Sequence, residues 1–111
     1  GDDMTTATDD AGLPALGGDL LDRAGELLRA LAAPVRIAIV LQLRASHRCV
    51  HELVDALDVP QPLVSQHLRI LKSAGVVAGE RSGREVMYRL VDHHLADIVV
   101  AALSHADEEH S

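Results

Sequence analysis

Apolar residues recur every three or four positions along most of the chain, the spacing that places them on one face of a helix. A first amphipathic helix is predicted from Asp19, a suitable N-cap, to about Ala32. Its inward face carries five aliphatic residues: Leu20, Ala24, Leu27, Leu28 and Leu31. A second helix is predicted from Pro34, which suits a first-turn position, to about Arg44. This second helix has so little polar surface that we expect it to be the central buried one.

The next two predicted helices are short and closely linked. One covers His51 to Leu57, and the other runs from about Gln61 to Ala74. Pro60 and Pro62 fall at the start of the second, where missing amide protons cost nothing.

Beyond Gly75 the apolar pattern changes from helical spacing to a period of two, with Val86, Tyr88 and Leu90 on one face. Two alternating segments, 76–81 and 84–90, flank Ser82 and Gly83, and this pattern predicts a two-stranded hairpin. Asp92 is then predicted to cap a closing helix. The predicted fold class is mainly α with a two-stranded β-wing, a winged helix-turn-helix.

The helix predicted over 61–74 has two unlike faces. Val64, Leu68 and Leu71 lie within about 60° of one another and should face the core. The opposite face and its flank carry small polar groups and cations, which suit base edges and phosphates in a DNA major groove. With two arginines near the hairpin turn, the candidate DNA-binding residues are Gln61, Ser65, Gln66, Arg69, Arg81 and Arg84. An ordinary amphipathic helix with a solvated outer face would show the same periodicity, and His67 is expected to be packed and hydrogen-bonded.

Length and composition predict one globular domain. The chain has 111 residues, 48% of them hydrophobic, with neither Phe nor Trp, so the core must be aliphatic and would gain further burial by oligomerising. Residues 1–18 are predicted to form an acidic, flexible N-terminal arm, and residues 19–110 the DNA-binding and dimerisation domain. No apolar run reaches the length of a membrane span and no secretory signal is present, so no membrane partner is expected. The single Cys49 suits a reducing compartment, and the expected localisation is cytoplasmic.

The charge is unevenly distributed along the chain. The net charge is −7, which as a bulk value argues against binding to nucleic acid. Residues 61–90, however, hold five Lys and Arg against two Glu, while residues 1–19 and 92–111 hold only acidic charges. This asymmetry indicates a localised anionic partner for the middle of the chain.

Three segments carry a family resemblance: LRALAAPVRIAIVLQL, CVHELVDAL and VSQHLRILKSAGVVAGERSGREVMYRL. Together they resemble the ArsR–SmtB family of metal-responsive bacterial repressors over roughly residues 19–110. The resemblance implies a homodimer formed by the first and last helices, which binds palindromic operator DNA. It also implies that Ser65, Gln66 and the wing arginines contact that DNA. Pro60 departs from the pattern, because many relatives have a serine there that caps the recognition helix and can contact phosphate.

The closing segment, DHHLADIVVAALSHADEEH, places imidazoles and carboxylates at both ends of one helix. His94 and His105 project within about 20° of each other but lie about 16 Å apart along the axis. One metal ion cannot bind both from a single helix, because metal–nitrogen bonds are about 2 Å long. An antiparallel copy of the helix would bring Asp92 and His94 of one chain against His105 and Glu108 of the other.

This four-residue set, Asp92, His94, His105 and Glu108, also matches the last-helix metal motif of the family. Two imidazoles and two carboxylates suit Zn(II), and also Co(II). Four neighbouring groups fall outside the set but could complete a six-coordinate Ni(II) or Co(II) shell: His93, Asp107, Glu109 and His110. The alternative is that all of these are ordinary solvated residues at the helix ends.

The sequence therefore predicts a repressor that binds operator DNA as a metal-free dimer and is released by Zn(II), or by Co(II) or Ni(II). Cys49 and His51 correspond to a second family metal site, but half of that site is missing, and Cys49 is expected to be buried. A metal-independent winged-helix repressor that answers to Cys49 oxidation or to a protein partner is the alternative. An enzyme is not expected, because the ligand pattern resembles neither HExxH nor a paired-carboxylate acid/base site.

Overall fold

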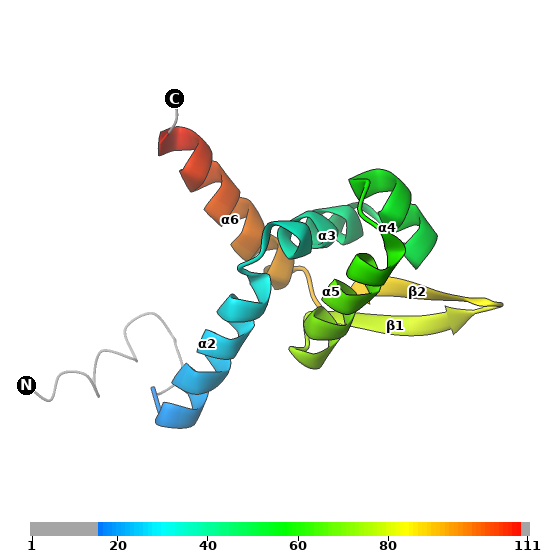
Figure 1. The fold of residues 1–111 in the computed structure, drawn as a ribbon. Coiled ribbons are helices and arrows are strands. Elements are labelled where there is room, and N and C mark those ends of the chain that lie inside the picture. Colours follow the sequence, from blue (N-terminus) through cyan, green and yellow to red (C-terminus); the bar gives the residue numbers. More distant parts are fainter. Residues whose placement is uncertain (1–15, 110–111) are drawn as a thin grey trace, which may run out of the picture.

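The computed structural model describes residues 16–109. The elements follow in the order α2 (Gly18–Leu31), α3 (Pro34–Ala45), α4 (Val50–Leu57), α5 (Gln61–Ser73), β1 (Val77–Ser82), β2 (Glu85–Leu90) and α6 (His94–Glu109) (Figure 1). Within residues 16–109, no helix has both the length and the apolar character that a membrane span requires. The predicted mainly α architecture with one β-wing is confirmed.

The start of the first helix differs from the prediction. α2 begins at Gly18, so it includes the last residue of the predicted arm; residues 1–15 of that arm lie outside the described part of the chain. The N-cap is Gly17 with extended backbone, not Asp19. Asp19 lies inside the first turn, where its carboxylate accepts a hydrogen bond from Arg23 Nε at 3.0 Å. The prediction of Asp19 as the cap was therefore wrong, because a capping side chain must precede the first helical residue.

The α3 helix lies at the centre of the fold, as its apolar composition predicts. It packs against α2, α4, α5, α6 and β2. Ile39 and Val40 have no exposed surface, and Leu43 retains only 4%. The core is aliphatic, and its largest fully buried side chains are Ile39, Val40, Leu53, Val64, Leu68, Leu71 and Val76.

The α4 and α5 helices form the helix-turn-helix pair. Between them Asp58 adopts a left-handed conformation (φ 55°) and closes α4 with a 2.9 Å bond from its amide to the Val54 carbonyl. Pro60 is the N-cap residue of α5, and Pro62 lies in its first turn. The predicted inward face is confirmed, since Val64, Leu68 and Leu71 are all buried.

The hairpin follows α5 directly and packs beside it. β1 pairs with β2 in antiparallel register from Val77–Leu90 to Ser82–Glu85. Arg48 forms a β-bridge to Tyr88, with Tyr88 N–H donating to Arg48 O at 2.7 Å and Arg48 N–H to Tyr88 O at 3.1 Å. This bridge fastens the base of the wing to the segment between α3 and α4.

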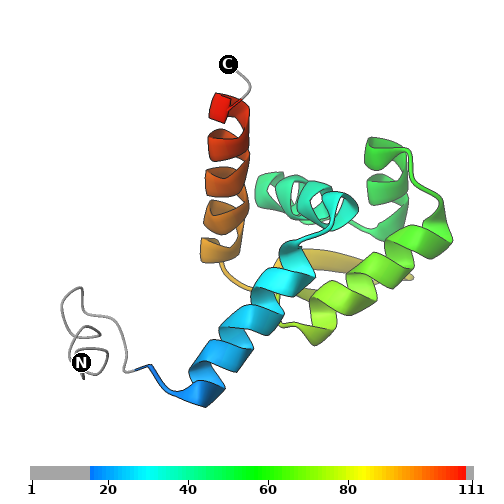
Figure 2. The same cartoon turned by 60° about the vertical axis from the view of Figure 1, so that its left-hand side comes forward.

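Two helices extend away from this core. The N-terminal half of α2 and the C-terminal half of α6 project beyond the remaining elements (Figures 1 and 2). Every residue from Ala101 to Glu109 is exposed. The first and last helices therefore have long faces that residues 16–109 do not cover.

Candidate functional site

The outer face of α5 presents the predicted DNA-binding side chains. Gln61, Gln66 and Arg69 are exposed, and Ser65 is half-buried on the flank that faces the wing. The buried stripe on the opposite side of the helix fixes this orientation. Pro60 makes no side-chain capping bond, so the helix start lacks the hydroxyl that many members of the resembled family have there.

The wing carries the two predicted arginines at its tip. Gly83 takes a positive φ of 66° in the turn, and Arg81 and Arg84 on either side are exposed. Figure 1 shows the hairpin extending clear of the helices. Within residues 16–109 the only ion pair of an arginine or lysine joins Arg23 to Asp19, so the cations of α5 and the wing are not neutralised by that part of the chain. The positive charge predicted from the sequence is thus available to an anionic partner.

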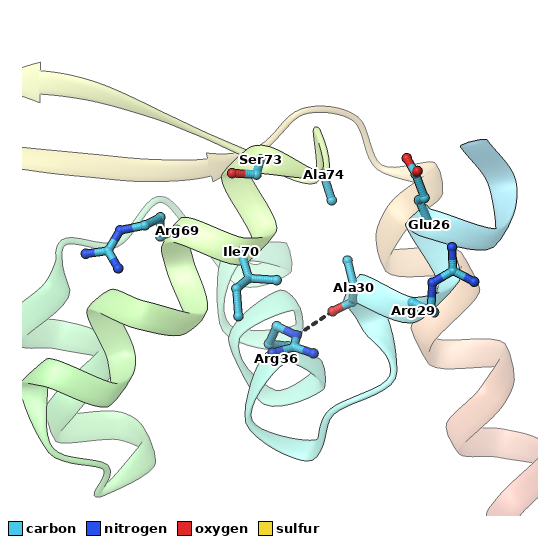
Figure 3. Close-up of a pocket in the computed structure, with 8 residues that line it drawn as sticks. All are labelled: Glu26, Arg29, Ala30, Arg36, Arg69, Ile70, Ser73 and Ala74. Atoms are coloured by element: carbon cyan, nitrogen blue, oxygen red, sulfur yellow. Dashed lines mark hydrogen bonds between the residues drawn. The ribbon is translucent and has the colours of Figure 1, made fainter. Parts of the chain in front are cut away.

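Arg36 on α3 joins the first helix to α5. Its Nε donates to the Ala30 carbonyl of α2 at 2.6 Å, and its Nη1 lies 3.2 Å from His67 Nδ1 of α5. Figure 3 shows the bond to Ala30 beside a cleft of about 540 Å³ between α2, α3 and α5. Burial, and secondly the charge of Arg36, lower the pKa of His67, which favours a neutral ring whose Nδ1 accepts a hydrogen bond from the Arg36 guanidinium.

These contacts confirm that His67 is a packed, hydrogen-bonded histidine. Arg36 could not be identified from the sequence, because a contact that spans 31 residues leaves no trace in local periodicity.

The predicted metal ligands lie in two separate pairs at the ends of α6. Asp92 Oδ1 accepts a hydrogen bond from the His94 amide at 2.9 Å, which confirms its capping role, and lies 3.3 Å from His94 Nδ1. At the other end His105 Nε2 lies 3.4 Å from Glu109 Oε2, a carboxylate outside the predicted set, while Glu108 is exposed. No group of three or more His, Cys, Asp or Glu within residues 16–109 could hold a metal ion. His110 lies outside the described residues.

The donor chemistry of each pair nevertheless fits half of a divalent metal site. The four predicted ligands are exposed, and each end of α6 offers one imidazole and one carboxylate: Asp92 with His94, and His105 with Glu108. Since the chain by itself does not bring the two pairs together, a complete shell requires a second molecule.

Apolar side chains remain uncovered on the same helices. Leu21 and Leu28 of α2 are 55% and 54% exposed, and Leu103 of α6 is 42% exposed. A shallow apolar groove between α2, α3 and α6 is lined mainly by Leu28, Leu31, Ile37, Ile98 and Ala102. The two projecting helices therefore form a continuous apolar surface.

Cys49 is buried, as predicted. It is 6% exposed and sits at the N-cap of α4, where its amide donates to Glu52 Oε1 at 2.9 Å in a capping box. Burial, assisted by the nearby Glu85 carboxylate, raises the pKa of the Cys49 thiol. A buried thiol with a raised pKa is a poor nucleophile. Cys49 is buried whereas the neighbouring His51 is exposed, and no group of three or more His, Cys, Asp or Glu within residues 16–109 could hold a metal ion there.

Comparison with known proteins gives consistent matches. The family model described as bacterial regulatory protein, arsR family, matches residues 33–78. The chain is 80% identical over 91 residues to the HTH-type transcriptional repressor SmtB of Mycobacterium tuberculosis, a match that covers 82% of this chain and 67% of that protein. It is 40% identical over 83 residues to the HTH-type transcriptional regulator NmtR of the same organism, covering 75% and 69%. A homodimeric winged helix-turn-helix DNA-binding domain from Mycobacterium bovis, a possible ArsR-family transcriptional regulator, superposes with a TM-score of 0.76 at 29% identity, covering 89% of this chain and 92% of that one.

Proposed function

The chain belongs to the ArsR family of bacterial regulatory proteins, and from this premise we propose that it is a metal-responsive repressor. It binds operator DNA as a metal-free homodimer and leaves the DNA when a divalent ion binds between the closing helices of the two subunits. Zn(II) is the first candidate for the ion, and Co(II) and Ni(II) are the alternatives. The family expected from the sequence is confirmed; the metal response and its ligands are the proposal.

The observation that carries the proposal is the arrangement of donors on α6. Asp92 and His94 are already within 3.3 Å of each other at one end, and His105 and Glu108 stand about 16 Å away at the other. In a two-fold dimer with antiparallel closing helices, each end of one helix meets the opposite end of its partner. Two equivalent sites follow, each with two imidazoles and two carboxylates. A bound ion would supply a bond that holds both subunits in one relative arrangement.

The exposed apolar surface supports the dimer that this site requires. Leu28 and Leu103 would lose their contact with water when a second copy covers α2 and α6. Uncovered leucines on two adjoining helices are unusual for an isolated domain of this size, whereas a small aliphatic core commonly gains stability by association.

The DNA-binding roles follow from the charge and exposure of α5 and the wing. Gln61 and Gln66 would meet base edges in the major groove, while Arg69 and Ser65, which lies on the flank that faces the wing, would bind phosphate. Arg81 and Arg84, at the tip of the wing, would bind the backbone on the flank. In the dimer the two α5 helices must lie about 34 Å apart to enter successive major grooves.

Arg36 connects the dimer helices to DNA recognition. Its guanidinium holds the end of α2 and His67 of α5 together, so a change in subunit arrangement at α2 reaches α5 through direct hydrogen bonds. Linkage requires that DNA weaken metal binding by the same factor by which metal weakens DNA binding. A clean switch needs a coupling free energy of about 3 kcal/mol or more.

The test is an operator-binding titration with and without Zn(II). The probe is a palindromic duplex selected by the metal-free protein from a random library. We expect Zn(II) to reduce affinity at least a hundredfold, as a coupling of about 3 kcal/mol implies. The His94→Gln variant should bind the duplex equally well in both conditions, while His93→Gln, which alters the adjacent exposed histidine, should behave like the wild type. Equal affinity of the wild type with and without the ion would end the proposal.

The alternative of regulation through Cys49 oxidation is not favoured. Its thiol is 6% exposed with a raised pKa, whereas redox-sensing thiols are accessible and acidic. The matched relatives are named as transcriptional repressors and regulators, and no catalytic role is proposed.

A further inference from the structure

A small polar cleft lies between α5 and the wing. It has a volume of about 220 Å³ and is lined by Ser65, Leu68, Arg69, Lys72 and Tyr88. Four of these side chains carry hydrogen-bond donors, two of them positively charged, and none is a carboxylate. Such a lining selects for an anion.

The four donors have no partner in the described part of the chain. Within residues 16–109, none of their side chains makes a hydrogen bond or an ion pair. Tyr88 is the most telling of the four. It is half-buried against the core, and its hydroxyl has no hydrogen-bond partner among residues 16–109. The only fully buried polar side-chain atom without a partner in that part of the chain is Arg48 Nε, so the Tyr88 hydroxyl is open to solvent. Partly buried tyrosines usually have a partner for this group, and Tyr88 is one of the residues that line the cleft.

The position of Tyr88 is fixed on both sides. Its backbone is held by the paired hydrogen bonds to Arg48. Across the hairpin it pairs with Gly79, where an added Cβ would lie 3.1 Å from Tyr88 Cε1 and 2.9 Å from Val86 Cγ1. Glycine at position 79 therefore leaves room for the ring, and the hydroxyl is held in place before any ligand arrives.

The cleft lies where a DNA backbone strand would pass. In B-DNA each major groove is separated from the next minor groove by one sugar–phosphate strand. If α5 enters the major groove and the wing lies along its flank, that strand must cross between α5 and β2. The cleft between these two elements is the point of crossing.

We propose that this cleft binds one phosphate of the operator backbone in each half-site, with the Tyr88 hydroxyl and the Lys72 ammonium as donors in addition to Ser65 and Arg69. The inference rests on the proposed function only in that α5 enters the major groove; it is independent of metal binding. Tyr88 and Lys72 thereby fix the depth and register of α5 on the duplex rather than reading bases.

The experiment measures affinity for the selected palindromic duplex over a range of salt concentrations, without metal. Tyr88→Phe retains the ring and removes only the hydroxyl. We expect roughly a hundredfold loss of affinity, because one hydrogen bond to a charged group, worth about tenfold, is lost in each of the two half-sites. The dependence of log affinity on log salt should be unchanged, since the hydroxyl is neutral. Lys72→Gln should instead reduce that slope by about 0.9 for each subunit. Arg23→Gln, which removes an exposed cation from α2, should alter neither quantity.

Neutral methylphosphonate substitutions, introduced one at a time along the duplex, locate the contact. Several positions per half-site should weaken the wild type, because Arg81 and Arg84 also bind the backbone. At only one of these positions should Tyr88→Phe lose little further affinity. Replacing chloride with phosphate buffer at equal ionic strength should leave the difference between wild type and variant unchanged; if the difference disappears, the cleft takes free phosphate and the inference is wrong.

Two further outcomes distinguish failure of the phosphate site from failure of the repressor proposal. If Tyr88→Phe is folded, as judged by an unchanged melting temperature, and binds the duplex like the wild type at every salt concentration, the phosphate site is refuted while the repressor proposal stands. If the wild type binds no duplex at all, both proposals fail.

Discussion

The metal site can be tested by asking whether two defective subunits restore each other. One variant carries Asp92→Asn and His94→Gln, and the other carries His105→Gln and Glu108→Gln. Asparagine at position 92 keeps a side-chain oxygen for the His94 amide, so the start of α6 is preserved. In a homodimer of either variant, both sites lose one of their two ligand pairs. In the mixed dimer, one site loses all four ligands and the other keeps all four.

The expected stoichiometry follows from the length of α6. The eleven residues between His94 and His105 span about 16 Å, whereas two ligands of one ion stand no more than about 4 Å apart. A site within one chain is therefore impossible, and only the mixed dimer has a complete shell. We expect about two ions per wild-type dimer, one per mixed dimer, and none retained by either homodimer.

The assay uses coexpressed variants with two different affinity tags, so that only mixed dimers survive both purification steps. Metal content and the absorption of the Co(II)-substituted protein then report the number and coordination of the ions. A control pair of coexpressed variants that carries His93→Gln and Glu109→Gln, which lie next to the four ligands but outside the set, should retain two ions per dimer. A mixed dimer without metal, or homodimers that bind as tightly as the wild type, would refute the antiparallel arrangement.

Three further predictions concern the fold. Leu103→Glu places a charge on the uncovered face of α6 and should convert the dimer to a monomer in sedimentation experiments, which an unchanged mass would contradict. Leu53→Ala removes a side chain with no exposed surface and should lower the free energy of unfolding by about 2–5 kcal/mol in urea denaturation, whereas Leu63→Ala, at a position 46% exposed, should cost far less. Because the folded-state pKa of His67 is lowered, the unfolded chain takes up the proton first as the pH falls below about 6.5. Stability should therefore decrease from that pH until the folded-state pKa is reached, and His67→Gln should remove this component; identical pH profiles for the two proteins would contradict the assignment.

Features that depend on periodicity could be predicted from the sequence. The buried stripe of α5 follows from the spacing of Val64, Leu68 and Leu71, and the exposed polar face follows from the same indexing. The hairpin follows from alternation around Gly83, whose positive φ requires a residue of this type. Each of these patterns lies within a single helix or hairpin, so the burial of one face is enough to determine it.

Features that depend on long-range contacts could not be predicted from the sequence. The role of Arg36 arises only when α2, α3 and α5 have packed together, and nothing adjacent to it in the sequence indicates its partners. The Tyr88 hydroxyl acquires its setting in the same way, from the register that pairs Tyr88 with Gly79. The capping box of Cys49 with Glu52 was detectable in principle, because the spacing matches that of serine and threonine caps, but cysteine is not an expected residue there.

The Arg36 contacts have a mechanical consequence. The planar guanidinium of Arg36 contacts the Ala30 carbonyl at 2.6 Å and the His67 imidazole at 3.2 Å. It therefore fixes the distance between α2 and α5, because neither helix can move relative to the other without breaking one of these hydrogen bonds. Each subunit should then turn as a rigid body when the dimer rearranges, with no hinge between its α2 and α5. Spin-label distances between those helices within one subunit should stay constant while the distance between the two α5 helices changes.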